Sequence, residues 1–288
     1  MSFQRWPARA PRFLLCLSVA AALSACSSSS FFSSIFPPGP DAPVANRVSA
    51  LLPVDALLLG EQHDAPEHHA IERETVEALA ARGALAALAL EMAEEGRSTA
   101  HVAATATEAQ VQAALGWNDK AWPWASYGPA VMAAVRAGVP VVGANLPRAR
   151  MKDAMADVSL DVQLNGEAYT AQQDAVREGH CKLLPESQII PMTRIQVGRD
   201  RAMAQAIVKA RQPGKTVLLI AGAGHAVRTL GVPQHLPDDV KVTSVRLLAS
   251  ATNDVEAGEF DKTWQTPPLP EKDYCAELRR PAKAPAAS

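Results

Sequence analysis

Short apolar segments alternate along the chain with longer segments in which apolar residues recur every three or four positions. The short segments predict five strands, at residues 56–60, 87–91, 139–143, 216–221 and 240–248. The longer segments predict helices over residues 67–82, 126–137 and 199–211. This alternation is typical of an α/β fold with a largely parallel sheet flanked by helices. By propensity alone, the alanine-rich segment 87–91 fits a helix equally well.

Residues 151–195 interrupt the alternation. They show no strand pattern but contain several stretches with helical spacing. An insertion of this length between strands is too long for an ordinary connection. We therefore expect a helical cap, or lid, over one end of the sheet at about residues 151–195.

The N-terminus has the pattern of an export signal. Arg5, Arg9 and Arg12 precede the apolar stretch 13–23, which falls well short of the roughly 20 residues that a membrane-spanning helix needs. Small residues follow it up to Cys26. The pattern predicts a cleaved signal peptide over residues 1–25.

Residues 23–26 resemble a bacterial lipobox, which implies cleavage before Cys26 and acylation of that cysteine, palmitate included. An ordinary secretory signal cut near Ala25 is the alternative. Ser27 follows the cysteine, and by resemblance to sorting rules the lack of Asp there favours the outer membrane. Residues 26–46, rich in Ser and Pro, then predict a tether, residues 47–275 the folded domain, and residues 276–288 a flexible tail.

Charge and cysteine content narrow the functional classes further. The net charge is −2 and no block of Lys or Arg stands out, so nucleic-acid binding is not expected. If Cys16 leaves with the signal and Cys26 carries lipid, Cys181 and Cys275 remain as a pair. Outside the cytoplasm this pair predicts a disulfide, worth about 4–5 kcal/mol in the chain-entropy model. Two free thiols or a thiolate ligand are the alternatives.

Polar residues follow four of the predicted strands. The strand ends carry Gly60-Glu61-Gln62-His63, Glu91-Met92, Gly143-Ala144-Asn145 with Arg148 nearby, and Gly222-Ala223-Gly224-His225. In an open parallel sheet, ligands bind beyond the carboxyl ends of the strands. Each residue alone could serve a helix cap or an Asx-turn. Four such endings together predict a ligand or catalytic site at this edge of the sheet.

Several of these motifs, in order, resemble one known family, the ChaN-like haem-binding lipoproteins. The matching segments are Gly60-Glu-Gln-His63, Leu90-Glu-Met92, Trp122-Pro-Trp124 with Tyr127 and Pro129, Asn145-Leu-Pro-Arg148, His180-Cys181 with Leu184-Pro185, and Ala221-Gly-Ala-Gly-His225. The family belongs to a wider group with erythromycin esterase, TraB and Tiki proteins. The resemblance implies an α/β sheet with a helical cap. It also implies haem binding at the bacterial surface for iron uptake, a homodimer enclosing two stacked haems, and an outer-membrane haem receptor as a partner.

The resemblance further implies a tyrosine as the iron ligand with histidine nearby. The chain offers Tyr127, Tyr169 and Tyr274. Tyr127 is the first candidate because it lies within the family-like segment, and Tyr169 in the predicted cap is its rival. A half-buried tyrosine bonded to the backbone is an equal alternative for Tyr127. Further haem-binding candidates are His63, His225, Arg148, Asn145 and His180.

A hydrolase is the alternative reading of the same strand ends. Two Gly-x-x-His motifs and a glutamate are typical of Tiki and TraB proteins, and His63, His225 and Glu61 or Glu91 supply these residue types here. His63, Glu91 and His225 could hold a divalent metal ion that activates water. In a metal-free version, a histidine oriented by a glutamate would act as the base. No Gly-x-Ser-x-Gly or His-Glu-x-x-His motif occurs, which disfavours serine hydrolases and zincins. A purely structural envelope lipoprotein is a third class.

Overall fold

The computed structural model describes residue 39 and residues 41–252, 258–276 and 278–279. The predicted signal peptide (1–25), the lipidation of Cys26, most of the predicted tether and the end of the predicted tail lie outside the described residues. The described residues fall within one compact unit, residues 37–288.

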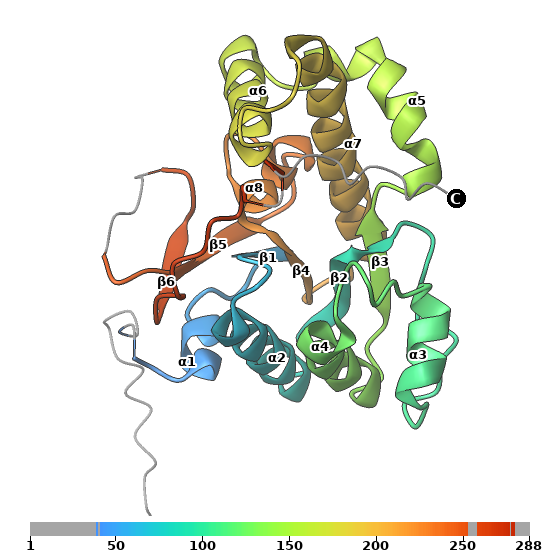
Figure 1. The fold of residues 1–288 in the computed structure, drawn as a ribbon. Helices are drawn as coiled ribbons and strands as arrows, with labels where there is room; N and C mark the ends of the chain where they lie inside the picture. The colour runs from blue at the N-terminus through green and yellow to red at the C-terminus, as the bar shows by residue number, and fades with distance from the viewer. Residues whose placement is uncertain (1–38, 40, 253–257, 277, 280–288) are drawn as a thin grey trace, which may run out of the picture. The chain divides into compact units, whose positions relative to one another are not determined.

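A sheet of six parallel strands forms the centre of the unit (Figure 1). In chain order the strands are β1 (Ala56–Glu61), β2 (Leu85–Glu94), β3 (Val141–Asn145), β4 (Thr216–Gly222), β5 (Val242–Ala249) and β6 (Lys262–Thr266). Their spatial order is β3-β2-β4-β1-β5-β6, and every pairing is parallel. The predicted α/β fold with a largely parallel sheet is therefore confirmed.

All five predicted strands are present, and the sixth strand escaped the sequence pattern. β6 lies at the edge of the sheet and pairs with β5 alone. It is short and exposes Lys262, while Trp264 and Thr266 are buried. A short edge strand needs few apolar residues, because much of it faces solvent.

Helices connect the strands. The α-helices are α1 (Val44–Ser49), α2 (Pro66–Ala81), α3 (Glu108–Leu115), α4 (Trp124–Arg136), α5 (Met151–Ala156), α6 (Gly166–Gly179), α7 (Glu186–Ala210) and α8 (Ala223–Ala226). Three short 3₁₀ helices are η1 (Arg148–Arg150), η2 (Val158–Val162) and η3 (Val232–His235). The pattern identified α2 and α4 but placed the start of α7 at residue 199, well inside the helix.

The folded unit begins earlier than the predicted tether boundary allowed. We expected the tether to extend to residue 46, but α1 starts at Val44. Val44 and Val48 are buried, one turn apart on the same face of the helix, and belong to the main apolar cluster. The predicted boundary is therefore corrected to a position before Val44.

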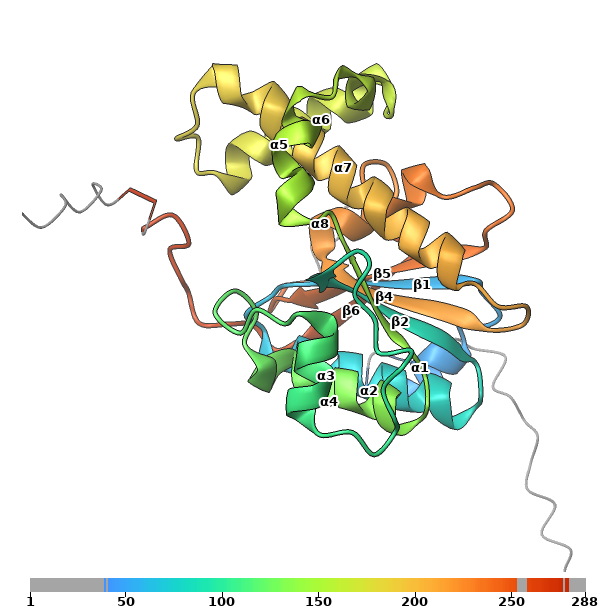
Figure 2. The ribbon, with the colours of Figure 1, turned by 90° about the vertical axis from the view of Figure 1, so that its right-hand side faces the viewer.

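Two apolar clusters cover the two faces of the sheet. Leu57 and Leu59 of β1 pack in one cluster with residues of α2 and α4, whereas Ala56 and Leu58 pack in the other with Met203 of α7. Successive residues of a strand point to opposite faces, so the near-continuous apolar run of β1 supplies both clusters. Figure 2 shows α2 and α4 on one side of the sheet and α7 on the other.

Residues 151–195 form α5, η2, α6 and the first part of α7, without a strand. Leu160 and Leu164 of this segment pack in a small apolar cluster that extends to Val197 of α7. In the same segment, the Arg194 guanidinium forms two hydrogen bonds to the Asp161 carboxylate, at 2.6 and 2.7 Å. Figures 1 and 2 show these helices beyond one end of the sheet, at the carboxyl ends of the strands.

Across the described residues, no helix is both long enough and apolar enough to cross a membrane.

Candidate functional site

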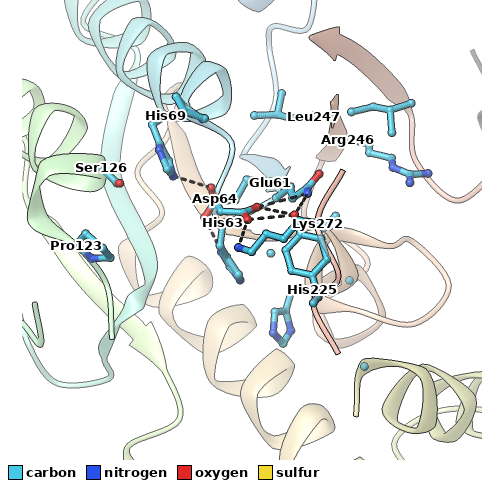
Figure 3. Close-up of a pocket in the computed structure, with 18 of the residues that line it drawn as sticks. Glu61, His63, Asp64, His69, Pro123, Ser126, His225, Arg246, Leu247 and Lys272 are labelled. Atoms are coloured by element: carbon cyan, nitrogen blue, oxygen red, sulfur yellow. Dashed lines mark hydrogen bonds and ion pairs between the residues drawn. The ribbon is translucent and has the colours of Figure 1, made fainter. Parts of the chain in front are cut away.

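A cavity of about 1330 Å³ opens at the carboxyl ends of the strands (Figure 3). Glu61 and His63 line it at the end of β1, and His225 lines it just after β4. Because β1 and β4 are neighbours with Glu61 paired to Gly222, both Gly-x-x-His turns open into this one space. Residues from the cap, from β5 and from the C-terminal segment complete the walls.

Glu61 is the centre of one half of the site. It is buried at the last position of β1, and its Oε1 accepts hydrogen bonds from the Tyr127 hydroxyl and from His63 Nδ1, each at 2.8 Å. Its Oε2 lies 3.3 Å from His69 Nε2. Burial alone would raise the pKa of Glu61, but the hydrogen bonds from His63 and His69 outweigh it and lower the pKa to about 2. Glu61 is therefore ionised at neutral pH.

His225 is the centre of the other half. Its Nδ1 lies 2.6 Å from Asp200 Oδ1 of α7, and its Nε2 lies 3.4 Å from Glu91 Oε1 of β2. The other oxygen of Glu91 accepts a hydrogen bond from the Gly222 backbone N–H at 2.8 Å. Burial opposes the charged imidazole, but Glu91 and Asp200 together raise the pKa of His225 to about 10. His225 is thus an imidazolium ion held between two carboxylates.

The two halves meet where His63 Nε2 lies 4.0 Å from Glu91 Oε2. A row results in which carboxylates alternate with donor groups, and it consists of Tyr127, Glu61, His63, Glu91, His225 and Asp200. Aromatic rings brace its first half, since Trp122 meets the His63 ring edge-on at 4.9 Å. Such a row holds the two imidazoles in place at the cavity.

His68 stabilises the turn after β1 through two hydrogen bonds. Its Nδ1 accepts a hydrogen bond from the Gln62 backbone N–H at 3.0 Å, and its Nε2 lies 3.1 Å from the Thr266 hydroxyl of β6. Burial lowers the pKa of His68 to about 4, so the ring is neutral and can accept that bond. His68 is therefore structural, whereas its neighbour His69 reaches the site.

Two predicted tyrosine ligands lie away from the cavity surface. Tyr127 is fully buried, and burial together with the charge of Glu61 raises the pKa of its hydroxyl. Tyr169 donates a hydrogen bond to Asp161 at 2.6 Å inside the cap, and burial and this carboxylate raise its pKa to about 12. Neither residue lines the cavity. Both hydroxyls are used to bind a carboxylate within the protein.

The remaining predicted residues divide between the cavity and its support. His180 lines the cavity, and its Nδ1 lies 2.8 Å from the Val176 carbonyl oxygen. Asn145 instead donates a hydrogen bond from Nδ2 to the Glu91 backbone oxygen at 2.8 Å, which positions Glu91. Arg148 is exposed, outside the cavity lining, and its backbone N–H bonds to Glu94.

The C-terminal segment supplies cavity residues that the sequence did not indicate. The predicted disulfide between Cys181 and Cys275 is present, with a Cα–Cα distance of 5.8 Å. Beside it, the Tyr274 hydroxyl accepts a hydrogen bond from Gln62 Nε2 at 2.8 Å and donates to Asp64. Lys272 also binds Asp64, at 2.7 Å. The disulfide thus ties the segment to the cap just after α6, and the contacts of Tyr274 and Lys272 hold it against the turn that follows β1.

Asp200 and Glu72 were also missed by the sequence reading. Both are buried acids on helices, surrounded in sequence by buried apolar positions. A charged residue on the apolar face of a helix was the available signal, since such residues are rarely buried without a partner. Burial, and next the charge of Glu61, raise the pKa of Glu72 well above its usual value.

Metal-binding side chains gather in one compact group. In the part of the chain that the structure describes, one group of three side chains places a ligand atom of each within 4.8 Å of the others, and it is Glu61, His69 and Glu72. The predicted ligands His63 and His225 contact different oxygens of Glu91, with Nε2 at 4.0 and 3.4 Å.

The fold and the site define an α/β protein whose ligand site lies at the carboxyl ends of a parallel sheet, under a helical cap. The chain belongs to the family described as haem-binding uptake, Tiki superfamily, ChaN, whose model matches residues 48–236. No curated protein matches the chain at a significant level.

Solved structures with the same fold include ChaN of Campylobacter jejuni, described as showing cofacial haem binding. It shares 25% identity with this chain at a TM-score of 0.62, covering 74% of this chain and 88% of that one. The type III effector HopBA1 is more distant, at 16% identity and a TM-score of 0.42, covering 82% of this chain and 99% of its own.

Proposed function

We propose that the protein binds haem in the strand-end cavity and serves haem or iron uptake as a lipoprotein of the outer membrane, anchored through Cys26. Family membership and the similarity to a haem-binding ChaN support the ligand. The lipobox-like segment that ends at Cys26 supports the anchor. The observation that carries the proposal is a large cavity that combines apolar walls, cations and one accessible tyrosine.

The residues of the cavity fit haem. Haem needs flat apolar walls, positive charge for its propionates and an axial ligand. Pro66, Pro129 and Leu247 contribute apolar surface, and Arg73 and Arg246 contribute positive charge. The volume of about 1330 Å³ exceeds the roughly 300–1,000 Å³ of typical small-molecule pockets, so a ligand as large as haem can enter.

Tyr274 is the proposed axial ligand. Among the three tyrosines of the chain it alone lines the cavity, and its side chain is half exposed. His63 and His225 are less suited, because each is paired with carboxylates that stabilise the protonated ring, which cannot bind iron. When bound, ferric haem would take a phenolate oxygen from Tyr274, while Arg73 and Arg246 bind the propionates.

We further propose that two copies of the chain associate around a pair of haems. The cofacial haem binding described for ChaN of C. jejuni supports this arrangement. It predicts that haem addition increases the sedimentation coefficient of the purified protein from that of a monomer to that of a dimer. An outer-membrane haem receptor would then be the partner that exchanges haem with the dimer.

An absorbance titration of haemin into the purified protein tests the proposal. We expect a saturable Soret change near one haem per chain, and Tyr274→Phe should abolish the high-spin charge-transfer band of a tyrosinate complex. Tyr127→Phe and Tyr169→Phe are matched controls that should leave the spectrum unchanged. Absence of a saturable change would reject haem binding, and an altered spectrum only in Tyr127→Phe would move the ligand to that residue.

A hydrolase is the second candidate, and the Asp200–His225 pair is the observation that favours it. A histidine oriented by a buried aspartate is a common general base. Here Glu91 holds the same imidazole protonated, with its pKa raised to about 10, so His225 would first have to lose its proton to act as a base at neutral pH. Haem-independent turnover of an ester or peptide substrate, lost in His225→Gln, would support this candidate over haem carriage.

A further inference from the structure

Behind the cavity wall, Glu61, His69 and Glu72 converge. A ligand atom from each of the three lies within 4.8 Å of the other two, and His69 Nε2 is 3.3 Å from Glu61 Oε2. His69 and Glu72 are three residues apart in α2 and therefore lie on the same face of that helix, directed at the end of β1. Figure 3 shows His69 reaching from its helix toward Glu61.

The polar atoms of this group are poorly paired. Both carboxylate oxygens of Glu72 are buried without a hydrogen-bond partner among the described residues, and the buried Glu61 Oε2 and His69 Nε2 face only each other, at 3.3 Å. Glu72 is completely buried. A buried acceptor without a partner destabilises a fold, and it does so more when it is charged. Two unpaired oxygens of Glu72 beside the buried Glu61–His69 contact indicate that a further group binds there.

A proton alone does not satisfy the group. One proton shared between Glu61 and Glu72 would pair a single oxygen of each and leave the second oxygen of Glu72 unpaired, while His69 Nε2 would keep only its 3.3 Å contact with Glu61 Oε2. A divalent cation binds two carboxylates and one imidazole at once, and it offsets the buried negative charge.

We propose that Glu61 Oε2, His69 Nε2 and Glu72 bind a divalent transition-metal cation of the Zn²⁺ type. Zn²⁺ binds imidazole nitrogens and carboxylate oxygens, and three protein ligands leave a further coordination position open. The other oxygen of Glu61 accepts hydrogen bonds from Tyr127 and His63, so these two residues orient the ligand carboxylate. Glu61 and His69 also line the cavity, which gives the ion a route to the site. The site shares no residue with the proposed haem contacts Tyr274, Arg73 and Arg246.

Metal binding is tested on the metal-stripped full chain in the absence of haem. Co²⁺ is the spectroscopic probe, and Zn²⁺ binding is counted by elemental analysis after dialysis. We expect about one Zn²⁺ per chain and visible Co²⁺ bands that Zn²⁺ displaces. Removing a direct ligand in Glu72→Gln or His69→Gln should weaken binding on the order of 100-fold or more, since even residues that only orient ligands contribute 10–100-fold.

Matched controls come from exposed positions. Glu67→Gln lies on the same helix as Glu72, and His101→Gln removes an exposed histidine outside the group. Both should bind metal as the unmodified protein does. Zn²⁺ should also raise the melting temperature of the unmodified protein and of both controls but not of Glu72→Gln. Circular dichroism confirms that the variants are folded.

Two results would overturn the proposal. The first is no stoichiometric Zn²⁺ or Co²⁺ in the unmodified protein, which would leave a shared proton or an internal water as the occupant. The second is binding that survives in Glu72→Gln and is lost in His225→Gln, which would transfer the metal to the neighbouring histidine. The haemin titration is independent of both, so failure of the metal site and failure of haem binding are distinguishable.

Discussion

The two Gly-x-x-His turns have the same sequence pattern and different chemistry. Both follow neighbouring parallel strands, in which Gly60 pairs with Ala221 and Glu61 with Gly222. The His63 side chain is 41% exposed and binds the acid of its own strand, whereas that of His225 is 13% exposed and is enclosed by acids from two other elements. The motif therefore determines the position of each imidazole at the strand ends, and the tertiary neighbours determine its exposure and its ion pairs.

The glycine of each motif leaves space for the segment that contains the other motif. A Cβ atom at Gly60 would lie 2.9 Å from Ala226 Cβ and 3.0 Å from Ala223 Cα, both in the segment after β4. A Cβ atom at Gly222 would lie 2.9 Å from His63 Nε2, in the turn after β1. Each glycine thus leaves room for the segment that follows the other strand, which brings the two histidines to one cavity.

The largest expected effect comes from removing the enclosed imidazole. His225→Gln leaves Glu91 and Asp200 buried without their cation, and we expect the free energy of unfolding to fall by about 3–5 kcal/mol. His63→Gln is the matched substitution and should lower it by less than about 1 kcal/mol, because a half-exposed ion pair is screened by solvent. Urea unfolding measures both, and equal losses would contradict the difference between the turns.

The pH dependence of stability separates the turns in a second way. The pKa of His225 is raised from 6.5 to about 10 by its two acids, so its stabilising effect is complete below about pH 6.5 and is lost as the pH rises toward 10. Unfolding free energies of the unmodified protein should therefore fall across this range, and those of His225→Gln should fall less. Parallel curves for the two proteins would show that His225 is not charged in the folded state.

At low pH, the dependence of stability on pH has the opposite sign. The pKa values of Glu61 and Glu91 are lowered to about 2, against burial, by their histidine partners. Their stabilising effect is complete above their usual pKa of 4.5 and disappears as the pH falls toward 2. In the same unfolding series, the loss on this side should persist in His101→Gln, whose exposed histidine touches neither acid.

The glycines give the smallest and most specific comparison. Gly60→Ala should destabilise the protein by about 1–3 kcal/mol, because its Cβ meets backbone and a buried methyl group that have no room to move. Gly222→Ala should be milder, because its Cβ meets the end of a half-exposed side chain that can turn away. Thermal unfolding ranks the two, and the reverse order would mean that His63 is fixed more firmly than its exposure indicates.

Several features could be predicted from the sequence for local reasons. The strands β1 and β4 are buried on both faces, so nearly all of their residues are apolar. The helices α2 and α4 are buried on one face, so their apolar residues recur with helical spacing. The Cys181–Cys275 pair followed from counting cysteines once export was assumed. The polar residues Glu61, Glu91, His63 and His225 could be placed at one edge because parallel strands end together.

Other features depend on residues far apart in the chain. Tyr127 shares a segment with the family-like aromatics, yet its hydroxyl is committed to Glu61, and the accessible tyrosine is Tyr274, which a disulfide brings back to the cavity. In the sequence Asp200 is a single acid within a helix, and only the packing of α7 brings this buried side chain to His225. Sequence spacing carries no information on such approaches, because side-chain burial and pairing are decided by how the elements pack.

The sequence by itself determined the parallel α/β fold and the edge of the sheet at which the polar residues gather, since both follow from periodicity and strand direction. The tertiary structure alone decided which acid meets which imidazole, which tyrosine reaches the cavity, and that Glu72 lies with Glu61 and His69. Those outcomes depend on contacts across β1, β2, α2 and α7, where a shift of a few ångströms exchanges a hydrogen bond for an unpaired buried charge.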